Sequence, residues 1–413
     1  MTSSAPGPWS GDRTPMPRPY SIETSSASRP FALPTTPASY PHLWRSPSWH
    51  WWKGLVILVV GGMFFLVDQT IAILLAASID ALTGRVPFSR FVRSASEGTI
   101  VTTPAIFIAN NLSLVVLVPA AMLLSWAVTG QRPRWLSSVV GGLRWRWLWL
   151  CIAMSVPLWL VLTAIDFFGS GGLAGNPLRV TGDTLPLVLA VILTTPLQSA
   201  GEEYTFRGVI NRSVASWVPT ELGGALAGGV VSSTLFMWAH GAGDPWLNLF
   251  YFCFGVISSY LTWRTGGLEA SIALHVVNNV TSEWSLPFVN ISTMFDRQDG
   301  TAGPGVLIQL ALPVISLALI VWQARRRGIV RRSSPDRAML QPAGVPPTPP
   351  PSSGTPAQWQ PSPWGWQQTT PPPPSWDDGS WGQQSQQPWQ QPGPPASAPP
   401  PDPSPRPPSA PPP

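Results

Sequence analysis

Long apolar runs alternate with short polar segments between residues 54 and 322. A helix needs about 20 consecutive apolar residues to cross the hydrocarbon core of a bilayer. Counting runs of that length predicts about eight spans, at residues 54–79, 104–128, 146–168, 185–210, 220–240, 246–263, 267–285 and 304–323. The pattern therefore predicts an all-α fold, a polytopic transmembrane helical bundle.

The composition of the two flanks differs from that of the apolar region. The chain has 413 residues, of which 51 are proline and 23 are tryptophan, and only 10% are charged. Such composition predicts disorder in a Pro/Ser-rich N-terminal tail, residues 1–50, and in a Pro/Gln/Trp-rich C-terminal tail, residues 326–413. Residues 51–325 form the predicted transmembrane domain. Proline tracts are also typical of ligands for aromatic grooves, so a cytoplasmic partner of the C-terminal tail is a further prediction.

Positive charges predict the orientation in the membrane. The segment Arg325–Arg332, RRRGIVRR, directly follows the last predicted span, and Arg and Lys favour the cytoplasmic side. An even number of spans then places both termini in the cytoplasm. The arginines at positions 132–144 fall on the same side, whereas those at positions 85–93 fall outside, against the rule. We expect a multi-pass protein of the plasma membrane with a retained first span.

The remaining composition excludes several classes of protein. A net charge of +5 is too small to indicate nucleic-acid binding. The two cysteines, Cys151 and Cys253, both lie inside apolar runs and predict neither a disulfide framework nor a metal knuckle.

Two adjacent glutamates and an arginine interrupt the fourth apolar run, in the stretch GEEYTFR. Glu203 and Arg207 are four residues apart, so on a helix they share a face and can pair, which neutralises one carboxylate. Glu202 lies about 100° around the helix and is free to face the bundle interior. Taken alone, the motif also fits a charged helix end at the membrane interface.

Two histidines lie within or beside later apolar runs. FMWAH ends at His240, and HVVNN places His275 and Asn279 one helical turn apart. Each motif alone is also typical of polar side chains that hold helices together through hydrogen bonds. Ionisable groups inside membrane spans are rare and are by default candidates for function.

Together, the three motifs supply the groups that activate water. A carboxylate and two imidazoles can act through a bound divalent metal, or the glutamate can act directly as a general base. The asparagine amide can donate a hydrogen bond to a developing oxyanion or orient an imidazole.

The strings EEYTFR, FMWAH and HVVNN resemble, in order and spacing, the EExxxR, FxxxH and HxxxN motifs of the CPBP intramembrane proteases. That family includes CAAX prenyl endopeptidases and bacteriocin-processing (Abi) proteins, and the resemblance covers about residues 185–285. It implies that Glu202 activates water, that Glu203 and Arg207 support it, that His240 and His275 complete the site, and that Asn279 stabilises the oxyanion. A divalent metal such as Zn would bind Glu202, His240 and His275.

The sequence thus predicts an intramembrane metalloendopeptidase that cleaves a membrane-anchored protein or peptide in contact with the lipid bilayer. Two alternatives remain: a non-catalytic membrane scaffold or transporter whose Pro-rich tail binds a partner, and a catalytically inactive family member. The predicted spans also raise a difficulty, because they put His240 roughly 30 Å from the membrane face near which Glu202 would lie.

Overall fold

The computed structural model describes residues 32–99, 101–172, 178–292, 294, 297–334, 359–362 and 365–368. The chain divides into two compact units, Met1–Pro347 and Thr348–Pro413. In the second unit, strand β1 (Trp359–Ser362) pairs antiparallel with strand β2 (Gly365–Gln368). Nearly all of the rest of the predicted C-terminal tail lies outside the described residues.

The first unit is a bundle of helices. Its longer helices are α1 (Trp51–Leu82), α3 (Pro104–Thr129), α4 (Trp145–Gly169), α9 (Glu221–Ala239), α10 (Pro245–Thr265), α11 (Glu269–Ser282) and α12 (Ala311–Arg326). Shorter ones are α2 (Phe88–Ser96), α6 (Thr184–Leu193), α7 (Thr195–Glu203), the π-helical turn η3 (Tyr204–Ile210) and α8 (Asn211–Trp217). The described residues of the unit also form four 3₁₀ turns: η1 (Tyr40–His42), η2 (Pro133–Leu136), η4 (Leu286–Phe288) and η5 (Pro304–Leu310).

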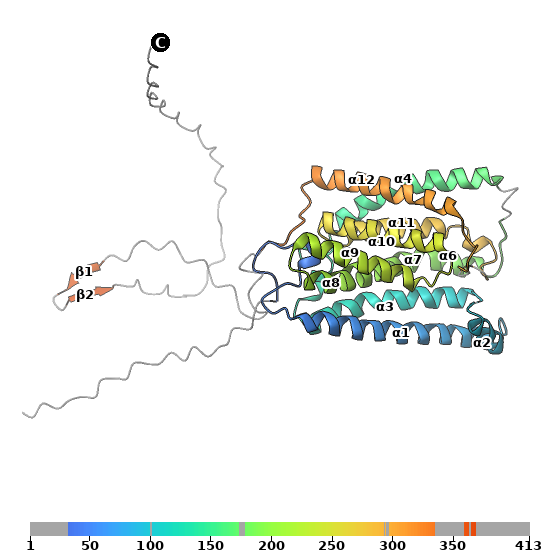
Figure 1. Ribbon diagram of the computed structural model, residues 1–413, viewed down its shortest axis with the longest axis horizontal. Helices are drawn as coiled ribbons and strands as arrows, with labels where there is room; N and C mark the ends of the chain where they lie inside the picture. The colour runs from blue at the N-terminus through green and yellow to red at the C-terminus, as the bar shows by residue number, and fades with distance from the viewer. Residues whose placement is uncertain are drawn as a thin grey trace, which may run out of the picture. The chain divides into compact units, whose positions relative to one another are not determined.

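The helices that carry the predicted motifs lie in the middle of the bundle. α1 packs on α3, α3 on α7, α7 on α11, α11 on α4, and α4 on α12, with α9 and α10 packed on each other. Figure 1 shows α1 and α3 along one side, α4 and α12 along the other, and α7, α9, α10 and α11 between them. The outer helices therefore flank α7 and α11, whereas α9 keeps large apolar side chains such as Leu226 and Trp238 exposed.

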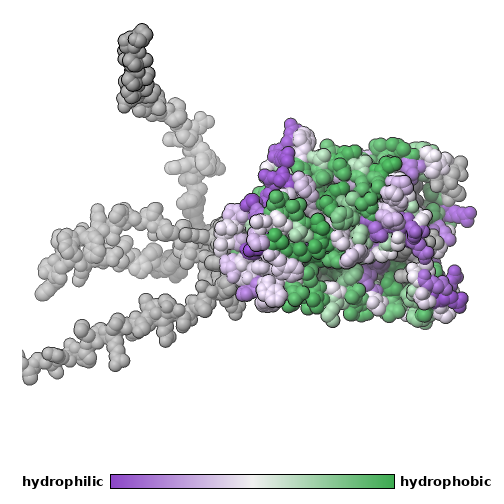
Figure 2. Space-filling view, viewed as in Figure 1, coloured by the Kyte–Doolittle hydropathy of each residue, from purple (hydrophilic) through white to green (hydrophobic). Residues whose placement is uncertain are grey.

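The surface of the bundle suits lipid. Large apolar side chains of α1, α4 and α12 are exposed along their whole lengths, and Figure 2 shows apolar residues over the middle of the visible face with hydrophilic ones toward its ends. Among the described residues, six helical segments are long and apolar enough to span a membrane: Trp51–Leu82, Pro104–Thr129, Trp145–Gly169, Thr184–Trp217, Glu221–Ala239 and Pro304–Arg326. The protein is a multi-pass helical membrane protein, as the sequence predicted.

The other two predicted spans correspond to α10 and α11. α11 is too short to cross a bilayer alone, with 14 residues, whereas α10 has 21 residues but is less apolar. α11 is mostly buried in the bundle, and α10 has one buried and one exposed face, so polar side chains of both can bond to neighbouring helices and the count of about eight is an approximation.

The fourth predicted span is longer than the sequence suggested and is built from several segments. It runs from Thr184 to Trp217 through α6, α7, η3 and α8. Gly201 allows α7 to pack directly on α3, because a Cβ there would lie 1.8 Å from the carbonyl oxygen of Leu114. The π-helical turn follows immediately after Glu203, and such turns are frequent at functional sites.

Residues 32–50 are folded, which corrects the predicted boundary of the N-terminal tail. Tyr40 and Trp44 are almost completely buried against the bundle. The Tyr40 hydroxyl donates to the carbonyl of Leu136 at 2.6 Å, and the guanidinium of Arg212 lies 3.7 Å from the centre of the tyrosine ring. The Pro/Ser-rich composition hid this segment because its order comes from tertiary contacts rather than from local periodicity.

The N-terminal and C-terminal flanks of the bundle meet at one end, which we call the terminal end. Ser39 pairs with Arg332 in an antiparallel bridge, and the amide of Ser333 donates to the carbonyl of Ala38 at 2.8 Å. α2 and the start of α6 lie at the opposite end, where Arg85 and Asp183 form a 2.7 Å ion pair. The described bundle thus begins and ends on the same side.

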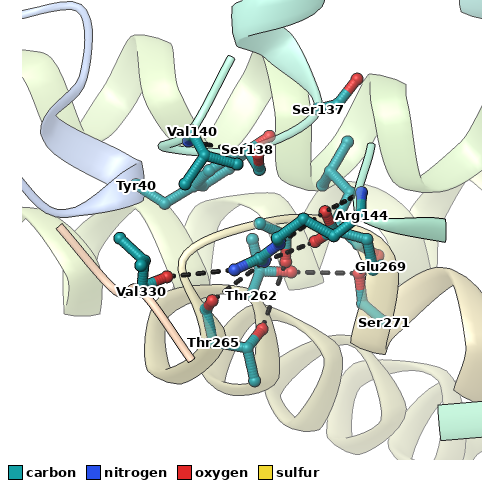
Figure 3. A network of polar contacts seen from close by, with 12 residues as sticks. Tyr40, Ser137, Ser138, Val140, Arg144, Thr262, Thr265, Glu269, Ser271 and Val330 are labelled. Carbon is teal, nitrogen blue, oxygen red and sulfur yellow. Dashed lines mark hydrogen bonds and ion pairs between the residues drawn. The ribbon is translucent and has the colours of Figure 1, made fainter. Parts of the chain in front are cut away.

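A buried ion pair fastens the start of α11 at the terminal end (Figure 3). Arg144 bonds Glu269 through its backbone amide, its Nε and its Nη2, the last at 2.6 Å. The same guanidinium donates to the carbonyls of Thr265 and Val330, each at 3.0 Å. This network ties the loop before α4, the turn between α10 and α11 and the C-terminal flank together.

Candidate active site

The three motifs converge in the interior of the bundle. α7 carries the two glutamates, η3 carries Arg207, the end of α9 carries His240, and α11 carries His275 and Asn279. The predicted difference in depth shrinks to about 5 Å because the fourth span continues to Trp217. Glu202 then lies 15 residues, about 23 Å, from that end, and His240 lies about 28 Å from the start of α9.

Glu203, Arg207 and His275 form the centre of the site. The predicted pair is present, with Arg207 Nη1 donating to Glu203 Oε1 at 3.0 Å and both side chains fully buried. The same oxygen lies 2.8 Å from His275 Nδ1. Because a carboxylate only accepts hydrogen bonds, Nδ1 must carry the proton, which leaves Nε2 as the acceptor in the neutral ring. The pair therefore fixes both the orientation and the tautomer of His275.

Glu202 faces His275 with one free oxygen. Its Oε1 accepts from Gln198 Nε2 at 2.5 Å, whereas its Oε2 is buried without a hydrogen-bond partner. Oε2 lies 3.4 Å from His275 Nε2. At that separation the two atoms can share a proton, or a water molecule beside them can bond to both, so the pair is chemically able to activate water.

Asn279 reaches Glu202 through an intermediate residue. Its Nδ2 donates to Gln198 Oε1 at 3.2 Å, and its Oδ1 accepts from Asn278 at 3.1 Å. An amide nitrogen has two hydrogens, so one remains for a substrate oxygen. Gln198 thus links the carboxylate of Glu202 to the predicted oxyanion residue.

His240 borders the site beside aromatic rings. Its Nδ1 lies 2.7 Å from the carbonyl of Phe236, so that nitrogen carries the proton and Nε2 is the acceptor. The ring stacks on Tyr251 with centroids 3.9 Å apart, and Phe236 contacts both histidine rings, with centroids 4.5 Å from His240 and 5.8 Å from His275. Arg297 Nη1 donates to the His240 carbonyl at 2.8 Å.

Two residues of the site, Gln198 and Tyr251, were not predicted from the sequence. Gln198 lies four residues before Glu202, a helical spacing that would have placed it on the same face. Tyr251 lies in an aromatic run, FYFCF, in which nothing distinguishes it from residues facing lipid. The contact of Tyr251 with His240 depends on the packing of α9 against α10.

The donor chemistry of the site resembles that of catalytic zinc. Two neutral imidazoles with free Nε2 atoms and one carboxylate are typical zinc ligands, and Nδ1 bonds to a carboxylate or a carbonyl are their usual support. However, the described residues contain no group of three His, Cys, Asp or Glu side chains gathered closely enough to hold a metal ion. We therefore derive no step through a metal.

The fold and the site define a class: a multi-pass membrane protein with carboxylate, imidazole and amide groups gathered in its interior. Residues 183–281 match the family model described as "Type II CAAX prenyl endopeptidase Rce1-like". This segment includes all six predicted site residues, so the predicted family resemblance is confirmed there.

One similar curated protein is "Uncharacterized protein YyaK" of Bacillus subtilis (strain 168), which is 24% identical over 151 residues. The alignment covers 34% of this chain and 49% of that protein, so the chain spans about half the length of the curated relative that it matches. No solved structure matches the chain.

Proposed function

We propose that the protein is an intramembrane endopeptidase that hydrolyses a peptide bond in a membrane-anchored protein or peptide, in CAAX-type or related processing. One observation carries the proposal. Within a segment that matches a peptidase family, Glu202 has one oxygen held by Gln198, and the other is unbonded 3.4 Å from His275 Nε2. A carboxylate held in this way is positioned as a general base.

The proposed reaction uses Glu202 twice. Glu202 takes a proton from water while the water oxygen forms a bond to the scissile carbonyl carbon. The second amide hydrogen of Asn279 stabilises the resulting oxyanion. As the C–N bond breaks, Glu202 returns the proton to the leaving nitrogen, so Glu202 ends as the carboxylate with which it began. Glu203 and Arg207 keep His275 oriented throughout.

A divalent metal, with zinc as the candidate, is a separate proposal for Glu202, His240 and His275. When bound, it would supply Lewis-acid polarisation of water or of the carbonyl. If the metal is required, a chelator should abolish cleavage by purified protein and added zinc should restore it. Full activity in metal-free protein would refute the metal proposal and leave the direct general-base route as the mechanism.

We further propose that both termini face the cytoplasm and that the protein lies in the plasma membrane. The meeting of the two flanks at the terminal end and the arginine cluster after α12 support this orientation. The substrate would be anchored in the same bilayer. A cytoplasmic partner of the Pro-rich tail remains a prediction about residues that are mostly outside the described ones.

The test compares Glu202→Gln with Glu221→Gln. Glutamine preserves the shape of Glu202 but cannot accept the proton, so cleavage should fall about 100-fold or more. Glu221 pairs with Arg332 at the terminal end, and its variant should retain activity. Membrane proteomics of cells carrying each variant should show uncleaved precursors only with Glu202→Gln. Equal processing by both variants would refute the proposal.

A further inference from the structure

Polar side chains of α7 and α11 face each other at three successive levels, which we call rungs. In the first rung, Glu202 approaches His275, and in the second, Gln198 bonds Asn279 at 3.2 Å. In the third rung, the Thr195 hydroxyl donates to Glu283 Oε2 at 2.7 Å. Each rung lies about one helical turn further from the terminal end, so Glu283 is about 12 Å beyond His275.

The third rung has no part in the proposed chemistry, yet it is built from several helices. Asn111 of α3 donates to the hydroxyls of both Thr194 and Thr195, at 2.9 and 3.1 Å. Thr195 in turn bonds the carboxylate of Glu283. Each further acid among spanning helices is costly, and such groups in membrane proteins typically line a water-filled path or an ion path.

Burial along α11 decreases toward the opposite end of the bundle. His275 is only 2% exposed, whereas Asn279 and Glu283 are half-buried. Aromatic rings pack around the site itself: Phe206 and Phe236 lie 5.2 Å apart, and Phe254 lies 5.2 Å from His275. The continuous polar track therefore leads away from the terminal end.

We propose that the three rungs form a hydration path that brings water to Glu202 from the membrane face opposite the terminal end, and that Glu283 marks its outer part. Hydrolysis consumes one water for each bond cut, and a site among apolar helices needs a polar route for it. The use of that water rests on the proposed peptidase function, but the existence of the path does not.

Cysteine accessibility tests the path without any peptidase assay. In a Cys151→Ser/Cys253→Ser background, Glu283→Cys protein is placed in sealed vesicles of known orientation. A charged, membrane-impermeant methanethiosulfonate reagent is then added to one side at a time, and modification is read by mass. Glu283→Cys should react from the face opposite the terminal end. The matched control is Val280→Cys, because Val280 lies on the same stretch of α11 but packs against the apolar cluster of Phe107 and Leu187. It should not react.

A second measurement covers the case in which the cysteine variant does not fold. Glu283→Gln keeps an oxygen that accepts from Thr195, whereas Glu283→Leu removes it. The leucine variant should lower kcat about tenfold with little change in KM, and the glutamine variant should keep most of the activity. No modification of Glu283→Cys, modification only from the terminal side, or equal modification of Val280→Cys overturns the path. Modification as expected in a protein without peptidase activity would refute the function and leave the path standing.

Discussion

Two buried Arg–Glu pairs border the same helix, α11, and they differ in how completely they are bonded. Arg144 and Glu269, at the terminal end, share three hydrogen bonds, and the guanidinium has two further carbonyl acceptors. Glu203 and Arg207, at the site, share one bond, and Glu203 Oε2, Arg207 Nε and Arg207 Nη2 are buried without partners.

We infer that this difference separates a structural pair from a pair that serves the proposed chemistry. A fully bonded ion pair has little capacity left for another ligand, whereas unpaired buried polar atoms are destabilising unless something else uses them. The pair at the site also orients a histidine, which the pair at the terminal end does not. We infer that the first pair holds α11 in place and that the second holds His275 for its reaction.

Matched charge-neutral variants give the largest expected contrast. Glu203→Gln should lower kcat about 100-fold, because an amide can donate to His275 Nδ1 and so favour the wrong tautomer. Glu269→Gln should lower the free energy of unfolding by about 2 kcal/mol, because Arg144 loses its counter-ion, and should leave kcat per folded molecule within about twofold. Proteolysis assays and thermal unfolding in detergent measure both effects. A large loss of kcat in Glu269→Gln without loss of stability would contradict the comparison.

A smaller effect is expected at Tyr251. Its ring supports the imidazole of His240 by stacking at 3.9 Å. Tyr251→Leu should reduce kcat about tenfold, because His240 is then free to rotate away from the site. Tyr251→Phe keeps the ring and should restore activity, which distinguishes a positioning role from a need for the hydroxyl. Equal loss in both variants would show that stacking is not what matters.

The local sequence predicted much of the site. Spacing alone gave the Glu203–Arg207 pair, since residues four apart on a helix meet regardless of the tertiary fold. Apolar run length gave most of the outer helices, because the bilayer imposes that length. The grouping of the three motifs came from their resemblance to a family, and the structure brings Glu202, Glu203, Arg207 and His275 into direct contact.

The features that were missed depend on packing between helices. The end of the fourth span at Trp217 could not be read from hydropathy, because α8 is polar on the side buried against the N-terminal flank. The order in residues 32–50 comes from contacts such as Tyr40 on Arg212, more than 170 residues away along the chain. The rung of Glu283 and Thr195 likewise requires the register of α7 against α11.

The smallest expected effect concerns the terminal end, where polar groups should hold the N-terminal flank on the bundle and take no part in catalysis. His42 is buried and lies 2.9 Å from the carbonyl of Ala215, and burial lowers the pKa of its imidazole below the usual 6.5. The folded state then binds fewer protons than the unfolded state as the pH falls below about 6.5. The free energy of unfolding is therefore at its full value above about pH 6.5 and decreases below it, by at most about 1.4 kcal/mol per pH unit. Thermal unfolding at pH 7.5 and 5.5 should show a smaller difference in His42→Gln than in the unmodified protein. An unchanged difference would mean that His42 has no part in the acid sensitivity, and a change in kcat at pH 7.5 would mean that the terminal end is coupled to the site.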